Sequence, residues 1–403
     1  MRKNWFTLNA DIFLWVKNHV GLAYNTGNKK RFLFPLSEGI KKVCHQLLKT
    51  ENLYTTELTD EDMNDKEIQQ WIHSLIEIRA GYLSYNIEFE KRPISLMPIL
   101  KVQDQMEHYE WQHMHKMGGE ILQNLHELTF YICESKYGNN EYFKQYIFPL
   151  KNSKVLDCSA IYSFICNSRN PFLSNINLVG NLFSYPDFEK FINKICSLSI
   201  QCTIHIMAQD FWDNIQKVKE INWPFYIQFN LLFDSVFDIS SLHDIFLPFH
   251  FTAFIFSEKD YIQLENMLEE EFFTDRNIRV IPLYNRKNLS FFESNVYIEK
   301  EELENIDLTR NEIFMKQALN TLNFGKLTVM SDGYVYANVN ANLLGTIYNS
   351  PYSLVYKEFT EGTSWFKIRN QMPCTDCIYQ WLCPSPSNYE TVIGKTNLCH
   401  IKQ

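Results

Sequence analysis

Apolar residues along the first ninety positions predict a small α/β unit. The runs ADIFLWVKN, GLAYNTGN and KRFLFPL predict three short strands separated by Gly and Asn turn signals. Two amphipathic helices follow, the first in SEGIKKVCHQLLK with Ser37 as its N-cap. The second places apolar residues at i, i+3, i+4, i+7 and i+8, namely Ile68, Trp71, Ile72, Leu75 and Ile76. The segment GYLSYN then predicts a returning strand.

From residue 127 to about 315 the pattern changes to strand-like apolar runs that alternate with amphipathic stretches. The strand candidates are LTFYIC, NINLVG, CTIHIMA, FYIQFNLLF, FTAFIFS and IRVIPLYN. The helix candidates are PDFEKFINKICSL, DFWDNIQKVKEI and DYIQLENMLEEEF. Repeated strand and helix alternation predicts parallel βαβ units, and therefore a barrel or an open doubly wound sheet.

Residues 91–126 read as a connecting segment between these two parts. The histidines His113 and His115 lie within it, two positions apart. A helix would point them in different directions, so we interpret them as exposed linker residues rather than metal ligands.

Composition and charge narrow the class of partner. The 403 residues are 45% hydrophobic and 15% aromatic, which is enough to build two or three cores. The formal net charge of -9 provides no general basic field for nucleic acid or an anionic membrane, so proteins, peptides or small molecules are the expected partners. With no secretion signal and no apolar run of about eighteen residues, the expected location is the cytoplasm.

Four of the ten cysteines crowd together near the C-terminus. They are spaced C-x2-C-x5-C-x15-C, at Cys374, Cys377, Cys383 and Cys399. Close cysteines in a large chain without a secretion signal are better explained by metal than by disulfides. Tetrahedral zinc and an iron–sulfur cluster both suit four sulfur ligands. Such a site has no open coordination position, so its role is structural or, at most, electron transfer.

Three segments carry a resemblance to a known family: WFTLNADIFLWVKN with LAYNTGN, then LHELTFYI, and finally LCPSPSNYE with GKTNLCH. On them the chain resembles the pseudo-radical-SAM, SPASM-type proteins encoded beside peptide maturases and GG-type precursor peptides in Bacteroidales. The resemblance implies a winged-helix-like peptide-recognition element (1–90), a linker (91–126), a degenerate partial (β/α)6 radical-SAM-type barrel (127–315) and a SPASM-like metal-binding domain (316–403).

The resemblance also implies that the catalytic motifs are missing. A radical SAM enzyme holds its cluster with C-x3-C-x2-C after the first barrel strand. The corresponding positions hold Cys133, Tyr137 and Asn140. One thiol of three cannot hold that cluster. The Gly-Gly-Glu-Pro motif that contacts SAM is replaced by Val179, Gly180, Asn181 and Leu182.

In the SPASM family the tail normally holds two auxiliary clusters. The ligand positions of the first are occupied by Asn338 and Ser387, so that set is broken. The four cysteines of the second, from Cys374 to Cys399, are all present. The resemblance therefore implies one [4Fe–4S] cluster, with structural zinc as the alternative, and no bound SAM.

These expectations favour a non-catalytic binding and scaffold protein. Its recognition element would capture a precursor peptide by β-augmentation, and its barrel would dock an active radical SAM maturase as a hetero-oligomer. Two alternatives stay open: an enzyme with unrelated chemistry in the barrel, or a redox relay through the C-terminal cluster. Candidate groups for the first alternative are Asp157, Cys158, Asp210 and Glu271.

Overall fold

The N-terminal unit contains two small antiparallel sheets covered by helices. The computed structural model describes residues 4–85, 92–100, 121–234, 249–268 and 278–401. One sheet has the order β5-β1-β6 and the other the order β2-β3-β4. Their strands are β1 (Asn4–Leu8), β2 (Ile12–Lys17), β3 (Val20–Asn25), β4 (Arg31–Pro35), β5 (Thr55–Leu58) and β6 (Gly81–Tyr85). The three predicted strands are confirmed as β2, β3 and β4, whereas β1 and β5 were not predicted.

Helices α1 (Glu38–Leu48), α2 (Asp60–Asn64) and α3 (Lys66–Glu77) complete this unit. The predicted N-cap is confirmed, because the Ser37 side chain accepts a hydrogen bond from the Ile40 backbone N–H. Four of the five apolar positions predicted on α3 are buried, but Ile76 lies at the edge of the stripe and is exposed. The predicted returning strand is β6, and it pairs with β1 rather than with the β2-β3-β4 sheet.

The connecting segment has little regular structure where the structure describes it. Residues 92–100 contain no helix or strand, and a short 3-10 turn, η2 (Ile121–Asn124), precedes the next sheet. The positions of His113 and His115 lie outside the described residues.

In the described part of the chain the largest sheet has nine strands, in the order β12-β11-β10-β9-β8-β7-β13-β14-β15. The strands predicted from the six apolar runs are all confirmed and pair in parallel. They are β7 (Glu127–Tyr131), β8 (Asn175–Val179), β9 (Gln201–Met207), β10 (Ile227–Phe233), β11 (Phe249–Ile255) and β12 (Ile278–Pro282). The protein is therefore a mixed α/β structure with a large, mostly parallel sheet.

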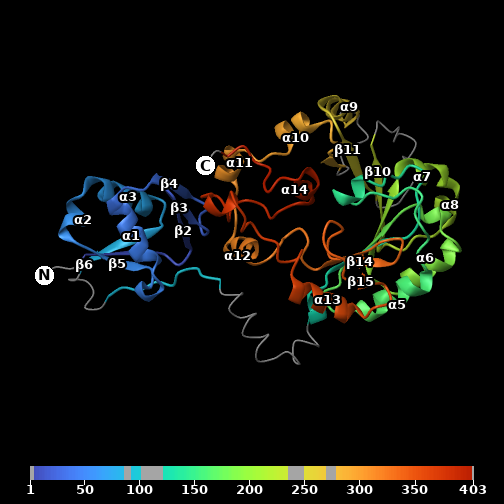
Figure 1. The fold of residues 1–403 in the computed structure, drawn as a ribbon, viewed down its shortest axis with the longest axis horizontal. Helices are drawn as coiled ribbons and strands as arrows, with labels where there is room; N and C mark the ends of the chain where they lie inside the picture. The colour runs from blue at the N-terminus through green and yellow to red at the C-terminus, as the bar shows by residue number, and fades with distance from the viewer. Residues whose placement is uncertain (1–3, 86–91, 101–120, 235–248, 269–277, 402–403) are drawn as a thin grey trace.

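Helices between these strands cover the outer face of the sheet (Figure 1). They are α5 (Cys158–Ser168), α6 (Phe188–Cys196), α7 (Ala208–Asp213), α8 (Ile215–Glu220) and α9 (Glu258–Leu268). The single helix predicted over 210–221 is two helices, because Asn214, whose φ of -116° is not helical, separates the end of α7 from the start of α8.

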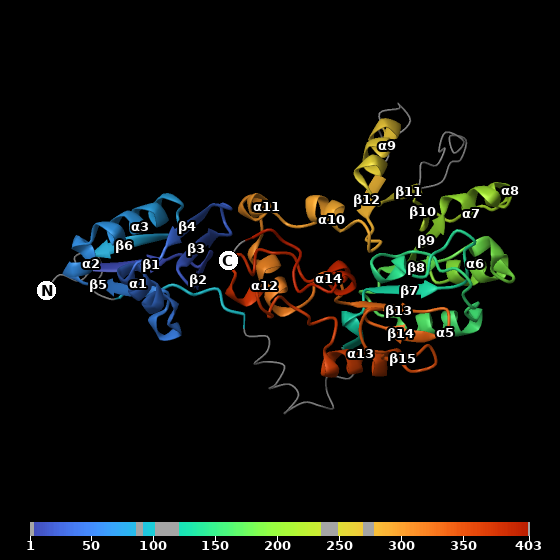
Figure 2. The ribbon, with the colours of Figure 1, turned by 45° about the horizontal axis from the view of Figure 1, so that its top comes forward.

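The C-terminal part of the chain does not form a separate domain, because one of its strands belongs to the large sheet. It contains α10 (Leu289–Asn295), α11 (Lys300–Asn305), α12 (Arg310–Ala318), β13 (Lys326–Val329), β14 (Tyr334–Tyr336), β15 (Gly345–Thr346), α13 (Pro351–Glu361) and α14 (Asn388–Ile393). The domain boundary drawn at 315 falls inside α12, and β13 pairs in parallel with β7. We call this C-terminal part, residues 289–401, the tail. Figures 1 and 2 show its helices α11, α12 and α14, in orange and red, between the N-terminal unit and the large sheet.

None of the helices in the described residues combines the length and the apolar content needed to cross a membrane.

Candidate functional site

Cys133 and Gly180 meet where β7 and β8 end. Cys133 is buried, and its Sγ donates a hydrogen bond to the Asn181 backbone oxygen at 3.1 Å. Gly180 has φ +131°, and a Cβ there would lie 2.3 Å from the Cys133 carbonyl oxygen, so only glycine is accommodated. Burial raises the pKa of the Cys133 thiol to about 12. At neutral pH this cysteine is a buried, protonated thiol.

The other two positions of the cysteine triplet point elsewhere. The Tyr137 hydroxyl donates to Asp213 at 3.2 Å. The Asn140 side chain exchanges two hydrogen bonds with the backbone of Lys151, at 2.9 and 2.8 Å. Cys133, Tyr137 and Asn140 therefore belong to three separate local contacts.

A buried carboxyl group links the loops that follow β7 and β8. Asp210, at the start of α7, is 2% exposed and accepts hydrogen bonds from the Ser135 hydroxyl and from Asn181 Nδ2. Burial raises the pKa of Asp210 to about 6, although the Ser135 hydrogen bond acts in the opposite direction. The sequence identified Asp210 as a candidate but missed Ser135, because the two are 75 positions apart.

The other candidate groups do not join this cluster. The Asp157 side chain accepts a hydrogen bond from the Ala160 backbone N–H and caps α5, which begins at Cys158. Burial raises the pKa of the Cys158 thiol. Glu271 lies outside the described residues.

An apolar segment of the chain covers the carboxyl ends of the parallel strands. Phe148 is fully buried and packs in one cluster with residues at or just after four strand ends, namely Met207, Leu232, Phe254 and Leu283. Phe143, Ile147 and Leu150 pack with Tyr131 and Val179 in a neighbouring cluster. We call residues 142–150 the plug. It fills the end of the sheet where the resemblance places SAM and its cluster.

Beneath the plug lies a cavity of about 900 Å³. Four of its lining residues, one on each of β8 to β11, stand two positions before the residues that contact the plug, so they share one face of the sheet. They form a hydrogen-bonded ladder across Asn177, His205, Asn230 and Thr252. Burial lowers the pKa of His205 to about 3, so the ladder is neutral at physiological pH.

The rim of the cavity is charged and includes part of the tail. Lys326 lies 3.7 Å from Glu127, and Arg279 also lines the space. Asn338 and Ser387, the positions of the broken auxiliary ligand set, line the same cavity, and Asn338 donates to the Asn388 side chain at 2.6 Å. Polar residues at every second position of β8 and β9 were a signal for this lining that the sequence reasoning missed.

The four C-terminal cysteines surround a second, small cavity. Cys374 begins the 3-10 turn η7 (Cys374–Asp376), and the Cys377 backbone N–H donates back to the Cys374 oxygen at 3.1 Å. The Cys383 N–H donates to the Tyr379 oxygen at 2.9 Å. The backbone of Cys399 forms an isolated parallel β-bridge with that of Ile298. All four thiols are free. Local turns therefore present three of the sulfurs, while the fourth comes from a distant strand-like segment.

A buried ion pair adjoins this cavity. Arg369 Nη1 lies 2.9 Å from Glu390 and 3.8 Å from Cys374 Sγ, and both charged side chains are 6% exposed. Arg369 Nε donates to the Pro384 carbonyl oxygen. The sequence reasoning did not identify this pair, since neither residue belongs to a motif.

The chemistry of the donor set suits a thiolate metal centre. Burial raises the pKa of Cys374 and Cys377, and that of Cys383 to about 12, so these groups are neutral thiols without a cation. A bound metal would stabilise the thiolate forms, as Arg369 does to a smaller extent. Among the described residues, no three ligand side chains are gathered closely enough to hold a single metal ion.

Comparison with known proteins finds similarity only at the level of structure. No protein-family model and no curated protein matches the sequence. The chain is similar to a crystal structure of Streptococcus suis SuiB bound to precursor peptide SuiA, with 12% identity and a TM-score of 0.47 over 98% of each chain. It is also similar to SuiB bound to S-adenosylmethionine, with 11% identity and a TM-score of 0.44 over 97% of each chain. Similarity at this level assigns no function to the present chain.

Proposed function

We propose that this chain is a non-catalytic peptide-binding and scaffold protein of ribosomal peptide maturation, and that it acts beside an active radical SAM maturase. The observation that carries the proposal is the plug, whose apolar side chains fill the strand ends. A cofactor at that place would have to displace a packed core, and Cys133 is already committed to a hydrogen bond with Asn181.

In this proposal the outer edge of β4 receives the precursor peptide. Within the described residues, no strand pairs with β4 on the side away from β3. The opposite edge strand, β2, faces the tail, where Lys17 donates to the Thr375 oxygen. Helix α3 lies beside β4, because the rings of Phe34 and Trp71 are 5.6 Å apart. An extended peptide can therefore add to β4 through main-chain hydrogen bonds.

Fluorescence anisotropy of a labelled GG-type precursor peptide, the kind that the resemblance implies, tests the peptide site. Leu33 on β4 and Tyr82 on β6 are 38% and 41% exposed, and both lie on edge strands of the same unit. We expect Leu33→Asp to weaken binding at least about tenfold, because it places a charge against the added strand. Tyr82→Asp is the matched control. Equal loss in both variants, or none in either, would reject β4 as the peptide edge.

The proposal further assigns one metal centre, preferably a [4Fe–4S] cluster, to Cys374, Cys377, Cys383 and Cys399. The centre would cross-link segments of the tail and leave chemistry to the partner. Iron, sulfide and zinc analysis of anaerobically purified protein identifies the metal; zinc without iron would replace the cluster with a structural zinc ion.

Two binding measurements address the non-catalytic role. Calorimetry with S-adenosylmethionine should show no binding, and coexpression with the neighbouring maturase and precursor should recover a complex. Specific SAM binding by the purified chain would contradict the proposal, and so would a pulldown that recovers neither partner.

A further inference from the structure

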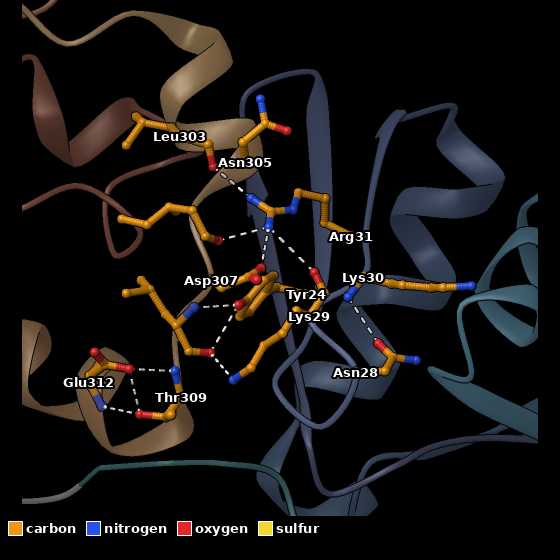
Figure 3. Close-up of polar contacts among 12 residues, drawn as sticks. Tyr24, Asn28, Lys29, Lys30, Arg31, Leu303, Asn305, Asp307, Thr309 and Glu312 are labelled. Atoms are coloured by element: carbon orange, nitrogen blue, oxygen red, sulfur yellow. Dashed lines mark hydrogen bonds and ion pairs between the residues drawn. The ribbon is translucent and has the colours of Figure 1, made fainter.

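The N-terminal unit is attached to the tail through backbone carbonyls. Arg31, the first residue of β4, donates to the carbonyl oxygens of Leu303 and Ile306, both at 2.8 Å. The Tyr24 hydroxyl donates to the Leu308 oxygen at 2.9 Å and accepts from its N–H at 2.7 Å. Lys29 reaches the same oxygen (Figure 3). These contacts join β3, β4 and the turn between them to α11 and to the segment between α11 and α12.

An apolar core lies beneath these polar contacts. Its buried members from the N-terminal unit are Phe13, Leu22 and Tyr24. Its buried members from the tail are Leu303, Leu308, Ile313, Tyr379 and Leu382. We call residues 374–383, which carry Cys374, Cys377 and Cys383, the cysteine loop. Tyr379 and Leu382 lie in this loop. The N-terminal unit therefore packs directly on the loop that carries three of the four thiols.

Three further contacts connect this interface with the cysteine cavity itself. Lys17 Nζ donates at 2.6 Å to the oxygen of Thr375, which stands between Cys374 and Cys377. Cys377 packs against the apolar core. Leu303 belongs to that core, lines the cysteine cavity and supplies one of the carbonyls bound by Arg31. A change in the conformation of the cysteine loop therefore alters the contacts between the N-terminal unit and the tail.

We infer that metal binding at the four cysteines and docking of the N-terminal unit on the tail are energetically coupled. The inference rests on the metal centre in the proposed function and adds a regulation to it. Without metal, the loop is held only by its backbone turns around free thiols; with metal, its sulfurs would be fixed relative to Leu303 and Thr375. A fixed loop presents a preformed surface to β2 and β3, which lowers the entropic cost of docking.

The coupling reaches the peptide edge, because Arg31 begins β4. Docking holds that end of β4 against residues 303–306, so metal loading would set how the edge is presented to a bound peptide. By thermodynamic reciprocity, docking of the N-terminal unit must strengthen metal binding by the same factor by which metal strengthens docking, so a variant that weakens the interface lowers metal affinity by up to that factor. This reciprocal effect provides a test that does not depend on any catalytic activity.

The test compares metal affinity among four versions of the full chain: wild type and the variants Arg31→Gln, Lys30→Gln and Lys17→Met. All four are purified anaerobically, iron and zinc are quantified, and chelator competition gives metal affinity. Lys30 is the matched control: it is exposed, neighbours Arg31, and points away from residues 303–312 in Figure 3. We expect Arg31→Gln to weaken metal affinity roughly tenfold, within the usual range of coupling between sites, and Lys30→Gln to leave it unchanged. Lys17→Met, at the other end of the interface, should also weaken it.

Hydrogen exchange on the same samples provides the second readout. Removing metal from wild type should accelerate exchange in β2 and β3 while the amides of β7, β8 and β9 stay protected. Unchanged metal affinity in both Arg31→Gln and Lys17→Met would overturn the coupling but not the metal centre. Metal affinity that falls as much in Lys30→Gln as in Arg31→Gln would have the same consequence. A wild-type chain that binds neither iron nor zinc overturns both the coupling and the metal centre.

Discussion

The strand ends of the large sheet and the cysteine loop of the tail differ in how their interiors are filled. At the strand ends, Phe148 and its neighbours pack closely, and Cys133 is hydrogen-bonded to the backbone. In the tail, four thiols surround a cavity beside the buried charges of Arg369 and Glu390. Dispersion and burial stabilise the first region on their own. The second keeps polar, ionisable groups inside, which is favourable only when a partner compensates for them.

The largest expected effect tests whether the plug is a true core. Phe148→Ala should lower the free energy of unfolding by about 4 kcal/mol, because it removes a fully buried ring and leaves a cavity. Urea denaturation measures it, with Phe225→Ala as the control, since Phe225 is 89% exposed. A cost below about 1 kcal/mol would mean that the plug is loosely packed and that the contrast with the tail is weaker than described.

The next effect concerns the buried charges of the tail. Glu390→Gln should cost about 3 kcal/mol, because it leaves the Arg369 guanidinium buried without its counter-charge. The exposed pair of Lys357 and Glu361 is the control, and Glu361→Gln should change stability by less than about 0.5 kcal/mol. A double variant, Arg369→Met with Glu390→Leu, should recover most of the loss. If Glu390→Gln behaves like Glu361→Gln, the ion pair has no structural role.

A smaller effect depends on pH. The pKa of Asp210 is raised from 3.8 to about 6, so the folded state binds more protons than the unfolded state between these values. Its contribution to stability is therefore fully present below about pH 4 and is lost as the pH rises through about 6. Asp213 and Lys136 also act on this group, with opposite signs. Asp210→Asn should raise the stability at pH 7 relative to pH 4 by roughly 2 kcal/mol compared with wild type.

Denaturation of Asp210→Asn and wild type at the two pH values measures this difference. Parallel changes in the two proteins would show that Asp210 does not titrate in this range. Such a result would mean that Asp210 and its hydrogen bonds with Ser135 and Asn181 do not make the stability depend on pH.

The smallest expected effect separates the two groups of cysteines. Cys133→Ala should leave metal content unchanged and cost only about 1 kcal/mol, because its thiol fills a small buried space. Cys383→Ala should abolish metal retention. Metal analysis of the two variants checks both statements. Loss of metal from Cys133→Ala would show that Cys133, rather than the tail cysteines alone, is needed to hold the metal.

The parallel strands were predictable from sequence because the face of the sheet that the helices cover selects apolar residues at every second position. Runs such as NINLV and CTIHIM stand out against their surroundings for that reason. β1 was not predicted, because the run NWFTL is short and its partner strands, β5 and β6, lie about fifty and eighty positions away in the sequence. The break at Asn214 was missed because an amphipathic pattern continues through it. Pairing of β13 with β7 joins segments about two hundred positions apart, which local periodicity does not encode.

Sequence by itself determined the four cysteines of the tail with their spacing, and the six parallel strands in their chain order. These properties depend on local chemistry, namely donor atoms, turns and periodic burial. Tertiary structure alone decided that Phe148 fills the strand ends, that Asp210 meets Ser135, and that Arg31 attaches the N-terminal unit beside the cysteines. Each of these contacts joins distant segments, and their energies depend on packing and desolvation that exist only once the chain has folded.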